Sequence, residues 1–222
     1  VLSLLYAGRP LAIPTLAEKS SAILDAWYPG TFGNIGICEL IFGDASPCGR
    51  VPMSFPHTTG QLPMSYNAFT TGRPIGEWNG FVPFASNYMD VPNTALYPFG
   101  WGLSYGEFEY SPITLSGDTL TFDGKITATV AVTNKGSMDA KEPVQLYITD
   151  VKGSVIRPCR ELKGLQKTMI RAGETVTLSF DITADMLKFY NEDMEFTAEP
   201  GEFTVWIGGS SLTKNSAGFR LV

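Results

Sequence analysis

Residues 125–133 read KITATVAVT and alternate between polar and apolar side chains. In an extended chain, one face would carry four apolar residues, Ile126, Ala128, Val130 and Val132, and the other face would be mostly threonine. A repeat of two residues is typical of a β-strand with one buried face. The stretch therefore predicts a sheet packed against a core.

The same alternation recurs at 144–148, 176–180 and 203–207. Turn-forming triplets lie between these stretches: Asn134-Lys135-Gly136, Ala172-Gly173-Glu174 and Glu199-Pro200-Gly201. Short, half-buried strands separated in this way indicate an antiparallel β-sandwich. A sandwich of this kind does not by itself specify any chemistry.

Composition changes midway along the chain. Residues 1–105 hold 11 of the 15 prolines and 4 of the 16 Lys and Arg residues, whereas residues 106–222 hold 4 prolines and 12 Lys and Arg residues. So large a shift favours a domain boundary near residues 106–120. We therefore divide the chain into residues 1–105 and residues 106–222.

Two strands are predicted in the first part. Residues 1–5 form an apolar run that ends at Gly8 and Pro10, which is typical of a buried strand entering a turn. A second strand is expected at about residues 50–55. Because the chain begins inside a buried strand, we expect it to be a piece of a longer protein.

Two helices are predicted between these strands. Residues 15–27 carry spaced apolar positions, and Thr15 with Glu18 matches a capping box. Residues 34–42 predict a second helix, which would stop at Gly43. Alternating strands and helices predict an α/β layered fold, so the whole chain is expected to be α/β plus all-β.

Regular periodicity fades between residues 56 and 105, a stretch rich in Pro, Gly and aromatic residues. A loop this long in a compact domain is usually functional or clamped against a neighbour. The candidate substrate-binding residues lie here: Arg73, Trp78, Tyr88 and Asp90. Their rings could stack on the face of a ring-shaped ligand and their charges could bond its polar groups, although loop charges are more often simply solvated. Equally, the aromatic residues could pack on another domain or on a second copy of the chain.

Two motifs predict structural contacts. Arg50 is expected to pair with a carboxylate or with loop carbonyls. Residues 100–105, GWGLSY, predict a contact between the two parts of the chain. Glycine allows close backbone approach, and Trp101 and Tyr105 would supply buried area.

Charge and cysteine content exclude several classes of function. A net charge of −6 and a pI near 4.8 argue against nucleic acid or an anionic membrane as a partner. The three cysteines form no C-x-x-C motif and there is one histidine, so neither a zinc site nor a cofactor is predicted. Free thiols are favoured over a bridge between Cys38 and Cys48. The acidic residues between 181 and 195 lack EF-hand spacing and are interpreted as a solvated surface rather than a calcium site.

Several motifs in order carry a family resemblance: Ala26–Thr31 (AWYPGT), Gly43–Pro56 (GDASPCGRVPMSFP), Tyr97–Tyr105 (YPFGWGLSY), Pro143–Ile148 (PVQLYI) and Arg160–Gly164 (RELKG). Together they resemble glycoside hydrolase family 3. Residues 71–74 and 88–90 are most similar to bacterial periplasmic β-glucosidases within it. The resemblance covers nearly the whole chain.

The resemblance implies three domains: a TIM-like barrel, an α/β sandwich and a fibronectin type III-like domain. Residues 1–105 would be the end of the α/β sandwich and residues 106–222 the third domain. The implied reaction is retaining hydrolysis of terminal β-linked glucose, with β-xylosidase activity as a variant. The nucleophilic Asp and the acid/base Glu are both expected upstream, so no catalytic role falls on this chain and the fragment alone is predicted to be inactive.

The resemblance also implies partners and a compartment. The partners would be an oligosaccharide or glycoside substrate and the N-terminal barrel of the same protein, with a homodimer left open. A periplasmic or secreted location is implied. The alternative function is a non-enzymatic carbohydrate-binding or adhesion module, which would have no use for the segment 43–56.

Overall fold

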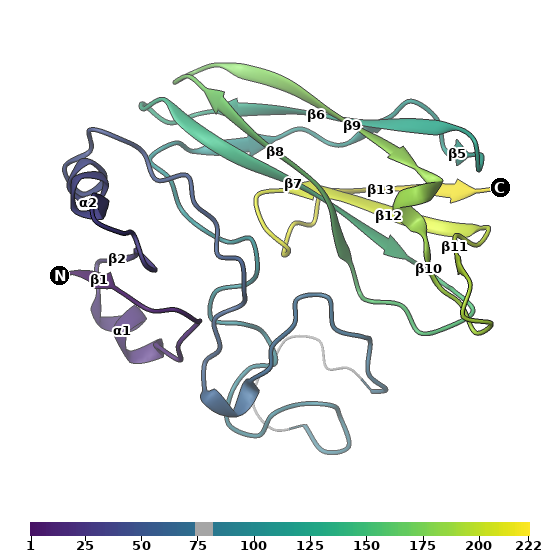
Figure 1. Ribbon diagram of the computed structural model, residues 1–222, viewed down its shortest axis with the longest axis horizontal. Helices are drawn as coiled ribbons and strands as arrows, with labels where there is room; N and C mark the ends of the chain where they lie inside the picture. The colour runs from purple at the N-terminus through teal and green to yellow at the C-terminus, as the bar shows by residue number, and fades with distance from the viewer. Residues whose placement is uncertain (74–81) are drawn as a thin grey trace.

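The computed structural model describes residues 1–73 and 82–222. Helices and strands follow in this order: β1 (Leu2–Leu5), α1 (Pro14–Lys19), β2 (Ala22–Asp25), α2 (Gly33–Phe42), the 3₁₀ turn η1 (Thr59–Gln61), β3 (Phe108–Tyr110), β4 (Thr114–Leu115), β5 (Thr119–Leu120), β6 (Lys125–Asn134), β7 (Ala140–Asp150), β8 (Glu161–Ile170), β9 (Thr175–Thr183), the 3₁₀ turn η2 (Ala184–Leu187), β10 (Phe189–Tyr190), β11 (Phe196–Thr197), β12 (Gly201–Gly208) and β13 (Ser216–Leu221). Figure 1 shows α1, α2, β1 and β2 at one end of the molecule and the strands β5 to β13 at the other. A long loop lies below them in this view.

Two sheets form the β-sandwich. One has the strand order β5-β13-β12-β7-β8, and β6 lies at the centre of the other, paired with β3, β4 and β9. The β6–β9, β7–β8, β12–β7 and β12–β13 pairs are all antiparallel. The predicted fold class, α/β followed by a β-sandwich, is confirmed.

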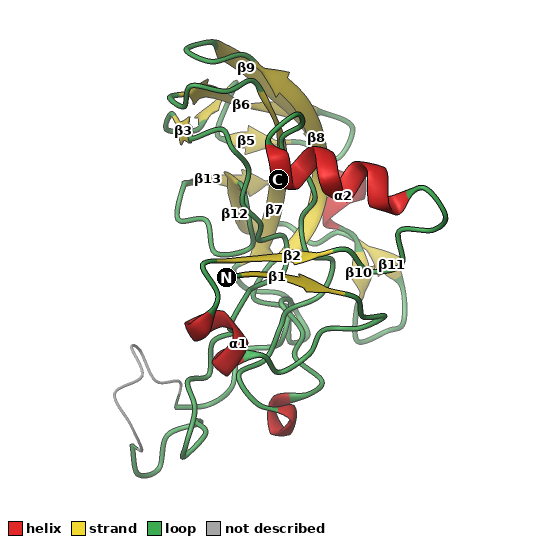
Figure 2. Cartoon of the chain, turned by 90° about the vertical axis from the view of Figure 1, so that its left-hand side faces the viewer, coloured by secondary structure: helices red, strands yellow, loops and turns green. Residues whose placement is uncertain are grey.

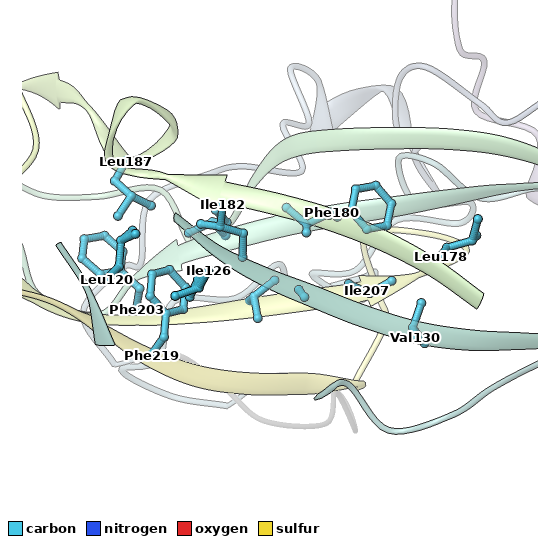
Figure 3. Packing of buried hydrophobic residues seen from close by; sticks show 14 of the residues in the cluster. Leu120, Ile126, Val130, Leu178, Phe180, Ile182, Leu187, Phe203, Ile207 and Phe219 are labelled. Carbon is cyan, nitrogen blue, oxygen red and sulfur yellow. The ribbon is translucent and has the colours of Figure 1, made fainter. Parts of the chain in front are cut away.

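The core lies between the two sheets. All four apolar residues predicted on one face of β6 are buried, none more than 3% exposed: Ile126, Ala128, Val130 and Val132. Figure 3 shows side chains of β6 and β9 directed at those of β12 and β13, with Phe203 beside Phe219. Those two rings stack with centroids 5.5 Å apart. Area buried in this way is the main stabilising term for a sandwich of this size.

The α/β part is small. β1 pairs in parallel with β2, Leu2 opposite Ala22, and Figures 1 and 2 both place the two strands between α1 and α2. The predicted strand at residues 1–5 is confirmed as a strand, but its predicted burial is not, because Leu2 and Leu4 are 47% and 39% exposed. α2 is confirmed as well, and it ends at Gly43 in the left-handed conformation (φ 83°), which glycine adopts without strain.

The predicted helix at 15–27 is wrong beyond residue 19. α1 ends at Lys19, and residues 22–25 form β2. A short apolar run fits a strand as well as a helix turn, and pairing with β1 decides in favour of the strand. Thr15 caps nothing, because the helix starts at Pro14 after Ile13. The capping box occurs instead at Thr58 of η1.

The predicted strand at 50–55 is also wrong. Only Phe55 forms a β-bridge, with Tyr97. Pro52 and Pro56 have no N–H to donate, and this prevents a regular ladder.

None of the helices in the described ranges is both long and apolar enough to cross a bilayer.

Polar contacts join the two parts of the chain. The Arg50 guanidinium lies 2.5 Å from a Glu142 carboxylate oxygen, and the Tyr110 hydroxyl donates to the other oxygen at 2.7 Å. The Gln145 amide donates to the carbonyl of Gly100 at 2.9 Å. The predicted pairing of Arg50 is confirmed, and its partner is a β7 side chain 92 residues away.

Residues 100–105 meet the second part of the chain at Gly100, as predicted, but Tyr105 is 44% exposed, and the hydrogen bonds of Trp101 and Tyr105 are with the first part. Trp101 stacks on Tyr97 with ring centroids 4.6 Å apart, and its backbone carbonyl accepts a hydrogen bond from Val51 N–H. The Tyr105 hydroxyl donates to the carbonyl of Leu40 in α2. A side chain at Gly100 would overlap Gln145, which explains the glycine at this point.

Candidate functional site: a rim loop and an adjoining cavity

Three of the four predicted site residues lie in the described loop segments 62–73 and 82–96, which we together call the rim loop. Arg73, Tyr88 and Asp90 are all exposed there. The structure does not describe residues 74–81, so Trp78 lies outside the described residues. Arg73 directly precedes residues 74–81, and Tyr88 and Asp90 follow them in the sequence.

Hydrogen bonds hold the two sides of the rim loop together. Ser86 N–H donates to the carbonyl of Arg73 at 2.9 Å, and the Ser86 hydroxyl donates to Gly72 at 2.6 Å. The Arg73 guanidinium reaches the carbonyl of Phe84 at 3.5 Å. Arg73 therefore lies beside the segment that leads to Tyr88.

A second set of bonds closes the turn that carries Tyr88 and Asp90. Asn93 accepts from Tyr88 N–H at 3.0 Å and donates to the carbonyl of Ser86 at 2.7 Å. The Tyr88 side chain is 39% exposed, so its ring is available to a ligand. Arg73 and Phe84 both have positive φ (51° and 62°), an uncommon backbone state for residues with side chains.

The buried side chain of Gln61 joins residues 57–58, just before the rim loop, to Pro92 near its end. Gln61 is 2% exposed, its amide donates to Pro92, and its oxygen accepts from the backbone N–H of His57 and of Thr58. Each polar atom of the side chain is thus satisfied, as a buried amide requires. His57 takes part in this contact through its backbone N–H.

A cavity of about 610 Å³ lies at the foot of the rim loop. Its lining is mainly apolar and includes Met53, Met64, Tyr66 and Phe99, with Arg9 as the charged member. A volume of this size with few polar groups is typical of small-molecule sites. Arg9 was missed from sequence, and the signal available was its place in Gly-Arg-Pro directly after an apolar strand.

Arg9 belongs to the carboxyl end of β1, and Asp25 ends the parallel neighbour β2. Ligands of α/β sheets bind outside the carboxyl ends of parallel strands. One Asp25 carboxylate oxygen is buried without a hydrogen-bond partner among the described residues, while the other accepts from Trp27 N–H at 3.2 Å. Burial raises the pKa of Asp25, and the Trp27 hydrogen bond partly offsets this.

Trp27 has a positive φ of 51°, a strained state that clusters at functional positions. Asp25 and Trp27 were not predicted as site residues. A signal was present in Ala26–Thr31, whose Pro29 and Gly30 indicate a turn directly after the strand.

The described candidate residues are aromatic, polar and cationic side chains on irregular backbone. Within the described ranges no three His, Cys, Asp or Glu side chains gather in a metal-binding cluster. The three cysteines are free thiols, as favoured from the sequence. The described candidates provide aromatic surface, the exposed guanidinium of Arg73 and, at the cavity, the guanidinium of Arg9, which suit recognition of a polar, ring-shaped ligand.

A small parallel α/β layer is followed along this chain by a long loop and a β-sandwich. Residues 1–105 match the glycosyl hydrolase family 3 C-terminal domain, and residues 142–211 match the fibronectin type III-like domain. The chain belongs to glycoside hydrolase family 3, of which it comprises the C-terminal domain and the fibronectin type III-like domain.

Relatives along the full chain agree. The periplasmic β-glucosidase of Salmonella typhimurium is 43% identical over 98% of this chain, and a putative β-xylosidase of Formosa agariphila is 43% identical over 100% of it. The crystal structure of a β-glucosidase from Listeria innocua in complex with glucose superposes with a TM-score of 0.94 at 38% identity over 100% of this chain. The chain spans 28–31% of the length of these relatives.

Proposed function

We propose that this chain is the carboxyl-terminal part of a retaining β-glycosidase that removes terminal β-linked glucose from oligosaccharides or glycosides. One observation carries the proposal: similarity to enzymes named β-glucosidase runs unbroken across both parts of the chain. A β-xylosidase is the close variant, supported by the relatives from Formosa agariphila. An adhesion module is not favoured, because residues 1–105 match a hydrolase domain.

In this proposal residues 1–105 complete the α/β domain and residues 106–222 form the third domain. Exposed apolar side chains on the first part support a further domain packed against it. They include Leu2 and Leu4 on β1 and Phe32, Ile35 and Phe42 on or next to α2, between 39% and 79% exposed. Apolar patches of this extent are typical of an interface.

The rim loop would contact the leaving group. Arg73 and Asp90 would bond its hydroxyls, and Trp78 and Tyr88 would stack on it. The second reading of these aromatic residues, contact with another copy of the chain, predicts a dimer of the full-length protein, and light scattering would detect it. We place the protein in the periplasm or outside the cell, supported by the name of the Salmonella relative.

The test is covalent trapping in the full-length protein with a 2-deoxy-2-fluoro-β-glucoside. A retaining enzyme forms a glycosyl intermediate on a carboxylate, and fluorine at C2 slows its hydrolysis. Peptide mass spectrometry is expected to find the label outside residues 1–222. A label within these residues would contradict the assignment of the nucleophile, and no label with no turnover of any β-glycoside would contradict the proposed activity.

A further inference from the structure

The start of the rim loop lies along an exposed sheet edge of the third domain. β8 is an edge strand, so backbone groups on its outer side have no strand to pair with. Residues 66–69 occupy this edge where β8 begins. Cys159 N–H donates to the carbonyl of Ala68 at 3.0 Å, and Phe69 forms a β-bridge with Pro158. Pro158 and Cys159 precede β8, so these contacts fix the loop to the segment that leads into β8.

Tyr66 adds a side-chain contact at the same edge. Its hydroxyl oxygen accepts a hydrogen bond from Leu162 N–H at 3.0 Å. Its ring stacks on Phe99, with centroids 4.0 Å apart and planes 12° apart, and meets Tyr147 edge-on at 6.0 Å. Tyr147 comes from β7 and is completely buried. One loop residue therefore joins a backbone donor of β8 to the aromatic core beneath β7.

This contact is close to the proposed leaving-group residues. Only residues 70–72 separate Phe69 from Arg73, and Arg73 is bonded across the loop to Ser86. Tyr66 also lines the 610 Å³ cavity. A change in the position of Tyr66 would therefore move the cavity wall and the base of the rim together.

We propose that the fibronectin type III-like domain positions the leaving-group rim of the enzyme, with Tyr66 as the positioning residue that connects β7 and β8 to Arg73. The inference rests on the proposed function. Loops sample several arrangements unless contacts restrict them, and a bound geometry that is displaced slightly lowers the rate strongly. The third domain would act on leaving-group selectivity without touching the cleaved sugar.

The experiment compares Tyr66→Ala and Tyr66→Phe in the full-length protein. Tyr66→Phe keeps the stacked ring and removes the acceptor for Leu162, so it separates the two contacts. The control is Tyr190→Ala on the β10–β11 hairpin of the same domain, where the tyrosine is 61% exposed and meets Phe196 instead of the loop. Circular dichroism melting verifies that each variant is folded, and Tyr66→Leu replaces Tyr66→Ala if the latter is not.

Two measurements are made on each protein. Hydrogen exchange followed by mass spectrometry reports the loop peptides, and kinetics are compared between a short aryl β-glucoside and a longer oligosaccharide. We expect Tyr66→Ala to accelerate exchange in residues 62–96 and to lower kcat/KM for the oligosaccharide roughly threefold to tenfold, mainly through KM. The short substrate should lose clearly less than the oligosaccharide, and Tyr66→Phe should recover most of the loss.

Unchanged exchange in residues 62–96 would overturn the proposal, and so would equal losses on both substrates. Neither result would contradict the proposed hydrolase activity, because that activity is measured with the short substrate in the unmodified protein. If the unmodified protein cleaves neither substrate, the proposed function fails instead, and the positioning inference falls with it.

Discussion

The Arg50 guanidinium and the Glu142 carboxylate form a buried ion pair across the seam between the two parts of the chain, 2.5 Å apart. Their side chains are 10% and 3% exposed. Tyr110 satisfies the second carboxylate oxygen, so charge and hydrogen bonding are balanced around Glu142. A buried pair of this kind ties a loop of the α/β part to β7.

Removing one partner of this pair should be costly. Arg50→Met would leave the Glu142 charge buried without compensation, and we expect a loss of about 3–5 kcal/mol in unfolding free energy at neutral pH. The control is Lys125→Met, because the Lys125–Asp181 pair is 63% and 50% exposed. Exposed pairs contribute about 0–1 kcal/mol. Urea denaturation measures both, and equal small losses would show that the Arg50 pair is screened by water.

The Glu142 carboxyl should make stability depend on pH. Burial raises its pKa above the ordinary 4.5, outweighing the attraction of Arg50. The folded state thus holds this proton more tightly than the unfolded chain does. The contribution of Glu142 to stability is fully present below pH 4.5 and is lost as pH rises through the raised pKa.

Glu142→Gln should remove this component from a plot of unfolding free energy against pH. Asp181→Asn is the control with the opposite sign. Hydrogen bonds from Lys125 and Thr127 lower the pKa of Asp181, so its contribution is lost as pH falls. If Glu142→Gln instead removes stability that appears only at higher pH, the direction given for its pKa is wrong.

Gly100→Ala should destabilise the seam more than its backbone conformation alone explains. Gly100 and Gly173 both have φ 76°, but a Cβ at Gly100 would lie 2.0 Å from the Gln145 side-chain oxygen, whereas nothing lies within 4 Å at Gly173. Gly173→Ala measures the strain of positive φ, about 1–2 kcal/mol. Gly100→Ala should cost about 1–3 kcal/mol more through overpacking. Equal losses in chemical denaturation would mean that Gln145 moves aside freely.

Tyr88→Ala and Trp78→Ala in the full-length protein should change discrimination between leaving groups. A lost stacking contact contributes about 1 kcal/mol beyond buried area, so kcat/KM should fall severalfold for an oligosaccharide and stay the same for a short aryl glucoside. Phe122→Ala, at a 48% exposed aromatic residue of the third domain, is the control. Equal small effects on both substrates with a lower Tm would indicate that the loop only packs.

Limited proteolysis of the isolated chain should leave a protected fragment that begins near residues 106–120. The β-sandwich has its own core, whereas α1 has no buried residue and α2 buries only Ile37. Sites in the first part should therefore open at lower free energy. N-terminal sequencing of the fragments tests the proposed boundary, and a resistant fragment that starts near residue 1 would contradict it. The same isolated chain should not hydrolyse an aryl β-glucoside.

Local patterns predicted those elements whose signal lies within a few residues. Alternation at 125–133 identified β6 and its buried face, and Gly43 identified the end of α2. The motif at 97–105 pointed to a contact between domains. In each case the physics is local: strand periodicity, a left-handed cap, and glycine where two backbones approach.

Other features depended on partners that are distant in the chain. Residues 22–25 became a strand because β1 pairs with them, and residues 50–55 did not because prolines interrupt the ladder. Arg50 was expected to pair with a carboxylate or with loop carbonyls, but only the fold selected Glu142, which lies 92 residues away. Only the fold brought Tyr66 to the edge of β8. Periodicity records which face of a segment is buried, whereas the energies of pairing, desolvation and stacking depend on which segments meet, and that is decided by the packing of the whole molecule.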